Sequence, residues 1–134
     1  MTGRFLLDTN IVSDLVRDPG GRASRRIARA GEQNVCTSII VAAEMRYGIA
    51  KRGSPRLLAQ LETIFRRLEI LPLESPSDVV YGDLRARLER TGTLIGPNDL
   101  LIAAQALALD LTVVTDNERE FSRVPDLRIE NWLR

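Results

Sequence analysis

Short apolar runs alternate with longer segments of helical periodicity along this chain. We predict helices over 11–16, 22–30, 40–50, 57–68, 79–88 and 98–109. The predicted strands cover 5–7, 35–38, 70–73, 111–115 and 127–129. Strands that are separated by helices favour a parallel sheet covered by helices on both faces. The pattern therefore predicts the α/β class, in which ligand sites lie beyond the carboxyl ends of the strands.

The segment Asn98–Leu109 is apolar nearly all round and rich in alanine. A helix without a polar face is expected in the interior of a protein. We therefore expect this helix to be buried and to pack closely on the sheet, ahead of the strand Leu111–Thr115.

The composition restricts the chemistry that the chain can perform. Its 134 residues predict a single domain, residues 1–134. There is no histidine, so the commonest general base and the commonest zinc ligand are missing. Cys36 is the only cysteine, so no intrachain disulfide, CxxC site or Cys–His pair can form. A net charge of +1 gives no broad basic field. Catalysis must therefore depend on carboxylates, hydroxyls, arginines or a metal held by oxygen ligands.

No targeting or membrane segment is visible in the sequence. The first apolar run ends at Asp8, which is too early for a signal peptide or for a spanning helix of about 20 residues. With one cysteine and no export signal, we expect the protein to act in the cytoplasm, without a membrane partner.

Acidic residues fall where a parallel sheet would gather them. Asp8 ends the first strand and Asp116 ends the strand Leu111–Thr115, so both belong to the same sheet edge. Glu44 lies about one turn into the helix that follows the second strand. Asp99 opens the buried helix, and a right-handed crossover would bring that helix start to the same edge.

Carboxylates that share a crevice repel each other and favour protonation, unless a cation neutralises them. Ligand sets made only of oxygen suit Mg²⁺ or Mn²⁺. Such ions activate water and stabilise the transition state of phosphodiester cleavage, with no need for histidine.

Each acid also has a purely structural interpretation. Asp8 precedes Thr9 and Asn10, either of which is a good helix cap. Asp99 would complement the dipole of the helix that it opens. Since Asp99 precedes three apolar residues, we expect it to be half-buried, where an uncompensated charge is costly. Glu44 likewise lies among apolar residues.

Asp116 has the weakest case of the four. Thr115 and Glu118 have the spacing of a capping box, which would make Asp116 part of a helix start. In that arrangement Glu118 and Glu120 are solvated charges of the following helix.

Taken together, these motifs resemble those of PIN-domain proteins and, more narrowly, of VapC-type toxins from bacterial toxin–antitoxin pairs. The resemblance covers the whole chain. It is carried, in order, by Leu7–Asn10, Ala43–Glu44 with Tyr47–Gly48, Asn98–Ala104 and Val114–Asn117.

This resemblance implies a three-layer α/β/α sandwich and an endoribonuclease that depends on Mg²⁺, with Mn²⁺ as a possible substitute. It implies that Asp8 and Asp99 hold the metal, and that Glu44 and Asp116 complete the catalytic acids. In some members the fourth acid falls at the position of Asn117, so both positions stay open.

The resemblance also implies partners. VapC-like toxins are blocked by a cognate antitoxin that covers the acidic site, and they commonly form homodimers. The toxin–antitoxin complex binds its operator DNA. The usual substrate is structured RNA, either tRNA or a ribosomal RNA loop.

Four arginines, at 22, 25, 26 and 29, recur about one helical turn apart. They would track an RNA backbone or simply form a solvated basic face. We favour the solvated face. Few aromatic residues are present, so RNA would be held by its backbone and shape.

Two other functions fit the same residues. One is a binding module of this fold that keeps the acids and has no turnover. The other is a metal-dependent DNA nuclease, because the chemistry does not distinguish the sugar.

Overall fold

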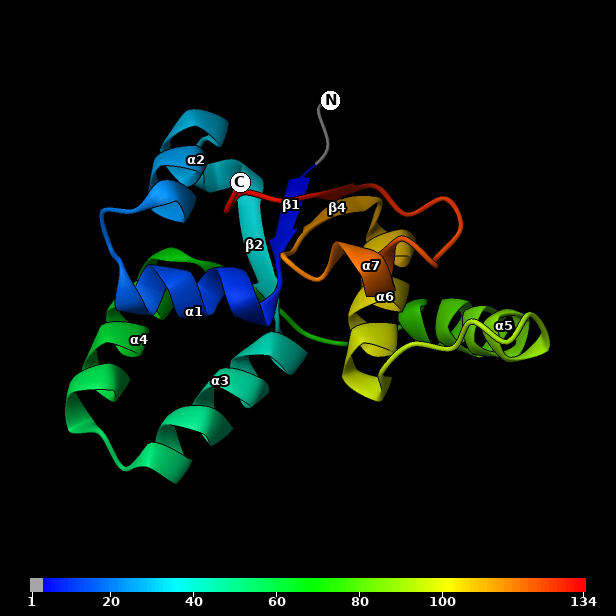
Figure 1. Cartoon of the computed structure of the whole chain (residues 1–134), viewed down its shortest axis with the longest axis horizontal. Coiled ribbons are helices and arrows are strands. Elements are labelled where there is room, and N and C mark those ends of the chain that lie inside the picture. The colour runs from blue at the N-terminus through cyan, green and yellow to red at the C-terminus, as the bar shows by residue number, and fades with distance from the viewer. Residues whose placement is uncertain (1–3) are drawn as a thin grey trace.

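Five parallel strands form the centre of the structure, in the order β3-β2-β1-β4-β5 (Figure 1). The computed structural model describes residues 4–134, so the first three residues of the predicted domain lie outside the described part. The strands are β1 (Arg4–Leu7), β2 (Val35–Ser38), β3 (Glu69–Leu71), β4 (Leu111–Val114) and β5 (Ile129–Glu130). The predicted parallel sheet is confirmed.

Helices fill the connections between these strands. They are α1 (Thr9–Arg17), α2 (Arg22–Ala30), α3 (Ile39–Arg52), α4 (Pro55–Arg67), α5 (Ser77–Arg90), α6 (Pro97–Leu109) and α7 (Glu118–Phe121), with a 3-10 turn at Glu32–Asn34. The edge strand β3 ends before Pro72, which has no N–H to donate to a further ladder bond.

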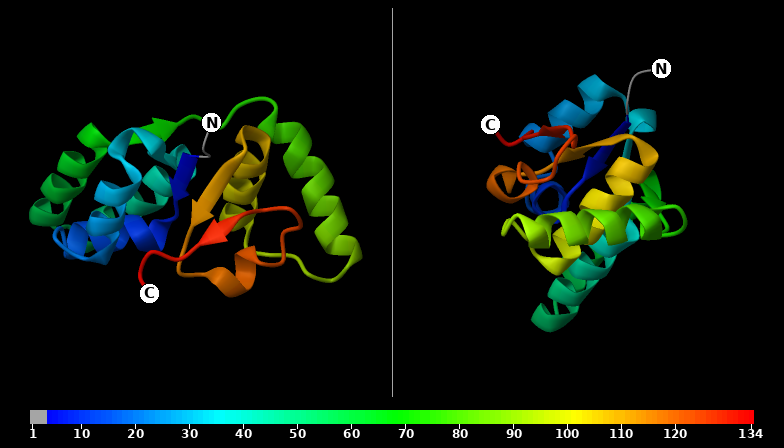
Figure 2. Two further views of the ribbon diagram at one scale, coloured as in Figure 1. Left: turned by 90° about the horizontal axis from the view of Figure 1, so that it is seen from above. Right: turned by 90° about the vertical axis from the view of Figure 1, so that its right-hand side faces the viewer.

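The helices form layers on both faces of the sheet, as the predicted sandwich requires. The chain moves one way across the sheet from β1 to β2 and the opposite way from β3 to β4. Right-handed crossovers in opposite directions place α1 and α2 on one face and α5 and α6 on the other. Figures 1 and 2 show these two groups of helices on either side of the strands.

Helix α6 is buried as its composition predicts. Its inner positions, from Leu100 to Ala106, are between 0% and 2% exposed, except Leu101. Gln105, fully buried, donates hydrogen bonds from Nε2 to the carbonyl oxygens of Leu71 and Pro72 at 3.4 and 3.0 Å. It thereby satisfies carbonyls at the end of the edge strand.

None of the helices within residues 4–134 combines the length and the apolar character that a membrane span requires.

The register of the sheet brings the ends of the central strands together. Leu7, at the end of β1, pairs with Val114 at the end of β4 and with Thr37 near the end of β2. Asp8 extends the ladder by one bond, because its N–H donates to the Val114 carbonyl at 2.9 Å. The segments that follow β1 and β4 therefore start side by side, next to the N-terminus of α3.

Candidate active site

Asp8 is the most buried acid of the sheet edge, with 3% of its surface exposed. It is itself the N-cap of α1, and its Oδ1 accepts a hydrogen bond from Thr9 N at 2.8 Å. Its Oδ2 accepts from Thr115 Oγ1 at 2.8 Å and from Asn10 Nδ2 at 3.3 Å. The structural interpretation in which Thr9 or Asn10 caps this helix is wrong, because α1 already begins at Thr9.

The pKa of Asp8 is raised above its ordinary value, mainly because burial disfavours the charged form. The hydrogen bonds from Thr115 and Thr9 stabilise the carboxylate and oppose this rise, whereas the charge of Glu44 adds to it. Asp8 is thus a carboxylate held in place by donors but short of positive charge.

Glu44 projects from α3 and joins three helices. Its Oε1 accepts a hydrogen bond from Thr9 Oγ1 on α1 at 2.6 Å, and its Oε2 accepts from Asn98 Nδ2 on α6 at 3.2 Å. Two neutral donors fix this side chain at the mouth of the site. The structure therefore places Glu44 beside the segment that Asp8 begins.

Asp99 lies half-buried in the first turn of α6, as predicted. Burial, and then the negative charges of Asp8, Glu120 and Glu44, raise the pKa of Asp99 to about 7. Three of the four acids predicted from the sequence, Asp8, Glu44 and Asp99, are thus close enough to act on each other electrostatically.

Glu120 joins these acids, although the sequence suggested a solvated helix charge. Its Oε1 accepts a hydrogen bond from the Gly96 N–H, and its Oε2 accepts from Asn117 Nδ2 at 2.7 Å. The same amide group donates to Asp99 Oδ2 at 3.2 Å. The hydrogen bonds from Gly96 and Asn117 lower the pKa of Glu120. In the sequence, the spacing of three residues between Asn117 and Glu120 indicates that both lie on one helix face.

Gly96 makes this arrangement possible. A Cβ atom at this position would lie 3.2 Å from Glu120 Oε1 and 3.8 Å from Asp99 Oδ2. The absence of a side chain lets the Glu120 carboxylate approach the backbone N–H at the start of α6, where the helix dipole favours negative charge.

Asp116 is not part of this group. Its side chain is exposed, and its Oδ1 accepts a hydrogen bond from Asn131 Nδ2 at 2.9 Å. The predicted capping box at Thr115 is also wrong, since α7 begins after Asn117 and Thr115 Oγ1 donates to Asp8 instead. Of the two positions left open, Asn117 is the one that touches Asp99.

The basic face of α2 is partly occupied by the C-terminal segment. Arg22 donates to the Leu133 carbonyl at 3.0 Å, and Arg26 pairs with Glu130 at 3.5 Å while covering the Trp132 ring. These contacts give Arg22 and Arg26 a structural role, and the preference for a solvated face over RNA binding stays a prediction.

The donor set at the acidic site fits a hard divalent cation, because carboxylate and amide oxygens surround it and histidine and cysteine do not. Burial and the excess negative charge of the site together raise the pKa of Asp99 to about 7, and that excess charge supports the same conclusion. Within residues 4–134, however, no three such side chains already converge on one cation position. Thr9 and Asn98 each donate one hydrogen bond to an oxygen of Glu44, and Asn117 donates one to Asp99, so each of these oxygens keeps a lone pair for a cation.

Comparisons with known proteins agree with this geometry. A sequence model of the family described as PIN domain matches residues 5–127. The chain is 38% identical to Ribonuclease VapC2 of Rickettsia felis over 130 residues, which is 96% of this chain and 97% of the relative. It is also 38% identical to the tRNA(fMet)-specific endonuclease VapC of Salmonella typhimurium, over 96% of this chain and 98% of the relative.

A solved structure gives the same result. The crystal structure of DNA-bound VapBC from Salmonella typhimurium contains a chain that superimposes on this one with a TM-score of 0.89 and 36% identity. The match covers 98% of this chain and 99% of that chain. The chain therefore belongs to the PIN-domain family and, within it, to the VapC-type toxin ribonucleases.

Proposed function

We propose that this protein is the toxin of a toxin–antitoxin pair and cleaves structured RNA, tRNA or an rRNA loop, with Mg²⁺ as its ion and Mn²⁺ as a substitute. The observation that carries this proposal is the group of mutually repelling carboxylates of Asp8, Glu44 and Asp99 at the carboxyl edge of the sheet. In this proposal, residues 1–134 form one nuclease domain. Because the substrate is cellular RNA, we propose that the protein acts in the cytoplasm.

Nucleases of this family generally depend on a divalent metal. We assign Asp8 and Asp99 as the residues that hold it. When bound, a divalent cation offsets the carboxylate charge and polarises both the phosphate and the attacking water.

The other residues of the site position these groups. Thr115 and Thr9 hold the Asp8 carboxylate by donating to its two oxygens, and Asn117 holds Asp99 against Glu120. Glu44 is oriented by Thr9 and Asn98, and we assign it to accept a proton from the attacking water. The water oxygen then forms a bond to phosphorus while the P–O bond to one ribose oxygen of the RNA chain breaks, and that leaving oxygen takes up a proton from solvent.

The fourth catalytic acid predicted from the sequence, Asp116, has less support. Its carboxylate is held by Asn131, away from Asp99. Glu120 is the better candidate, because its charge raises the pKa of Asp99.

The partner that we propose is a cognate antitoxin, because several similar structures are toxin–antitoxin complexes, including VapBC2 of Rickettsia felis bound to a promoter DNA fragment. By the same similarity, operator DNA is reached through the complex. A homodimer remains a prediction from the family resemblance.

The experiment is cleavage of total bacterial RNA by purified, antitoxin-free protein, with Mg²⁺, with Mn²⁺ and with EDTA, followed by sequencing of the new ends. An Asp8→Asn protein purified identically controls for contaminating nuclease. We expect metal-dependent cuts at one or a few sites that the variant does not make. A folded parent protein that cuts no RNA with either metal would favour the silent binding module, and equal cutting of a matched DNA would favour the DNA nuclease.

A further inference from the structure

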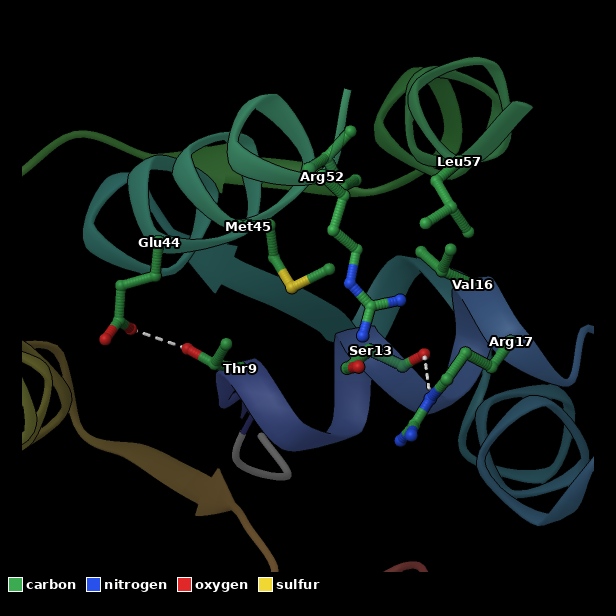
Figure 3. Close-up of a pocket in the computed structure, with 10 residues that line it drawn as sticks. Thr9, Ser13, Val16, Arg17, Glu44, Met45, Arg52 and Leu57 are labelled. Carbon is green, nitrogen blue, oxygen red and sulfur yellow. Dashed lines mark hydrogen bonds between the residues drawn. The ribbon is translucent and has the colours of Figure 1, made fainter. Parts of the chain in front are cut away.

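A hollow of about 250 Å³ lies beside the acidic site, between α1, α3 and the start of α4. It shares Thr9 and Glu44 with that site, and Figure 3 shows the Glu44 carboxylate at one end of it, turned toward Thr9. The hollow is thus a direct continuation of the site where RNA is proposed to be cut.

Two arginines enter the other end of the hollow. Figure 3 shows Arg52 extending from α3, and Arg17 from α1, so that both guanidinium groups lie near Ser13. Neither forms an ion pair with an acid anywhere in residues 4–134. Among the described residues, the side chain of Arg17 has one long hydrogen bond, from Nε to the Ser13 carbonyl at 3.4 Å. By contrast, Arg46 on the same helix α3 binds both oxygens of Glu62, at 3.2 and 2.9 Å.

The apolar part of the lining strengthens the attraction between the two arginines and an anion. Val16, Met45 and Leu57 contribute apolar surface to the hollow. Charges next to apolar walls are screened less than charges in open water. Two guanidinium groups supply planar donor pairs that match the oxygens of a phosphate.

The geometry points to a second phosphate-binding subsite: Arg17 and Arg52 bind the RNA backbone phosphate that neighbours the one cut at Asp8, Glu44 and Asp99. This inference rests on the proposed function and adds to it the path of the substrate, along the groove between α1 and α3. RNA is favoured as the occupant because the hollow opens directly onto the cutting site, through which the RNA chain has to pass.

Both arginines also lie in the last turn of a helix, where a cation complements the helix dipole. The control must share that property. Arg87 and Arg90 lie in the last turn of α5, are exposed, and form no ion pair with the described acids. The double variant Arg87→Gln/Arg90→Gln is therefore the matched control for Arg17→Gln/Arg52→Gln.

The test is binding of bulk tRNA in EDTA over a range of KCl concentrations. Without divalent ions the RNA is not cut, and the salt dependence counts phosphate contacts. We expect Arg17→Gln/Arg52→Gln to raise Kd about tenfold. The slope of log K against log salt should fall in magnitude by about 0.7 to 0.9, which is the loss of one phosphate contact. The Arg87→Gln/Arg90→Gln control should change neither quantity.

A second pair of variants tests the hollow without removing an arginine. Gly48 lines it, and nothing lies within 4 Å of a Cβ atom there, so Gly48→Glu places a negative charge in the hollow without a clash at Cβ. Gly82 on α5 has equally open space and gives the matched control Gly82→Glu. Weaker tRNA binding by Gly48→Glu, and not by Gly82→Glu, is expected.

An unchanged Kd and slope in Arg17→Gln/Arg52→Gln overturn the inference. If the Kd for tRNA is unchanged while the same variant loses affinity for the co-purified antitoxin, the arginines bind an acidic group of the antitoxin and not RNA. These outcomes are separate from failure of the proposed function, which is read from cleavage by the parent protein with Mg²⁺ or Mn²⁺.

Discussion

Thr115 Oγ1 donates a hydrogen bond to Asp8 Oδ2 at 2.8 Å, across 107 positions of sequence. The same hydroxyl accepts a hydrogen bond from Asn117 N at 2.9 Å. One buried side chain therefore connects the carboxylate at the end of β1 to the segment after β4 that carries Asn117 and Glu120. The acids of the site depend on this link for their relative positions.

Thr115→Val keeps the shape of the side chain and removes its hydroxyl. We expect a loss of about 1–3 kcal/mol of stability, because a buried carboxylate oxygen and a backbone N–H lose a partner. The pKa of Asp8 should rise further, since the Thr115 hydrogen bond lowers it. Thermal or urea unfolding measures the first effect, and Thr115→Ser, which keeps the hydroxyl, should restore most of the stability. A Thr115→Val protein as stable as the parent would contradict this role.

Substitutions of Glu120 and Asp116 are expected to differ in their effect on the pKa of Asp99. Glu120→Gln removes a charge that raises the pKa of Asp99, so that pKa should fall below about 7. Asp116→Asn removes a charge from the same loop and should leave the pKa of Asp99 unchanged, because its exposed carboxylate is bound to Asn131. NMR titration of the Asp99 carboxyl carbon in metal-free protein compares the two. A larger change in the pKa of Asp99 in Asp116→Asn than in Glu120→Gln would indicate that Asp116 is the fourth acid of the site.

The raised pKa of Asp99 makes stability depend on pH in a defined direction. An unfolded aspartate has a pKa near 3.9, and the folded value is about 7. Between about pH 4 and 7 the folded state holds the extra proton, so the free energy of unfolding falls as pH rises through this window. With allowance for solvent screening, the loss should be on the order of 1–2 kcal/mol.

Asp99→Asn removes this dependence and is the test of it. The difference in unfolding free energy between variant and parent should grow in favour of the variant as the pH rises from 4 to 8, measured without metal. Asp83→Asn, at an exposed position on α5, is the matched control and should follow the parent. A parent and an Asp99→Asn protein with parallel pH profiles would mean that Asp99 is not under charge repulsion.

A bound cation should relieve the same repulsion. We expect Mg²⁺ or Mn²⁺ to raise the melting temperature of the parent at pH 8 by binding the folded state preferentially. The increase should be much smaller in Asp99→Asn and unchanged in Asp83→Asn, as measured by calorimetry with and without EDTA. An equal increase in all three proteins would place the cation elsewhere.

The central acids of the site could be predicted because strand ends carry topological information. Since β1 is parallel to both of its neighbours, β2 and β4, Asp8 lies at the sheet edge where these strands end. Helix α3, which carries Glu44, starts at the same edge. Asp99 needed one further rule, the right-handed crossover that brings the start of α6 to this edge. The apolar sequence around these residues was enough to establish each element.

The segment after β4 was harder to predict, because a shift of one residue turns every side chain to the other side. Thr115 and Asn117 point into the site, while Asp116 between them points outward to Asn131. The sequence could not show which set faces inward. Glu120 was missed for the same reason, since its role depends on where α7 begins.

The catalytic role of the carboxylates is tested by the initial rate of RNA cleavage at saturating Mg²⁺ by Glu44→Gln. We expect a loss of about 10²-fold or more, the typical contribution of a general base, in a protein that melts like the parent. Glu89→Gln, on the exposed side of α5, should keep the parental rate. A Glu44→Gln protein that cleaves at the parental rate would contradict the assignment of these carboxylates as the catalytic centre.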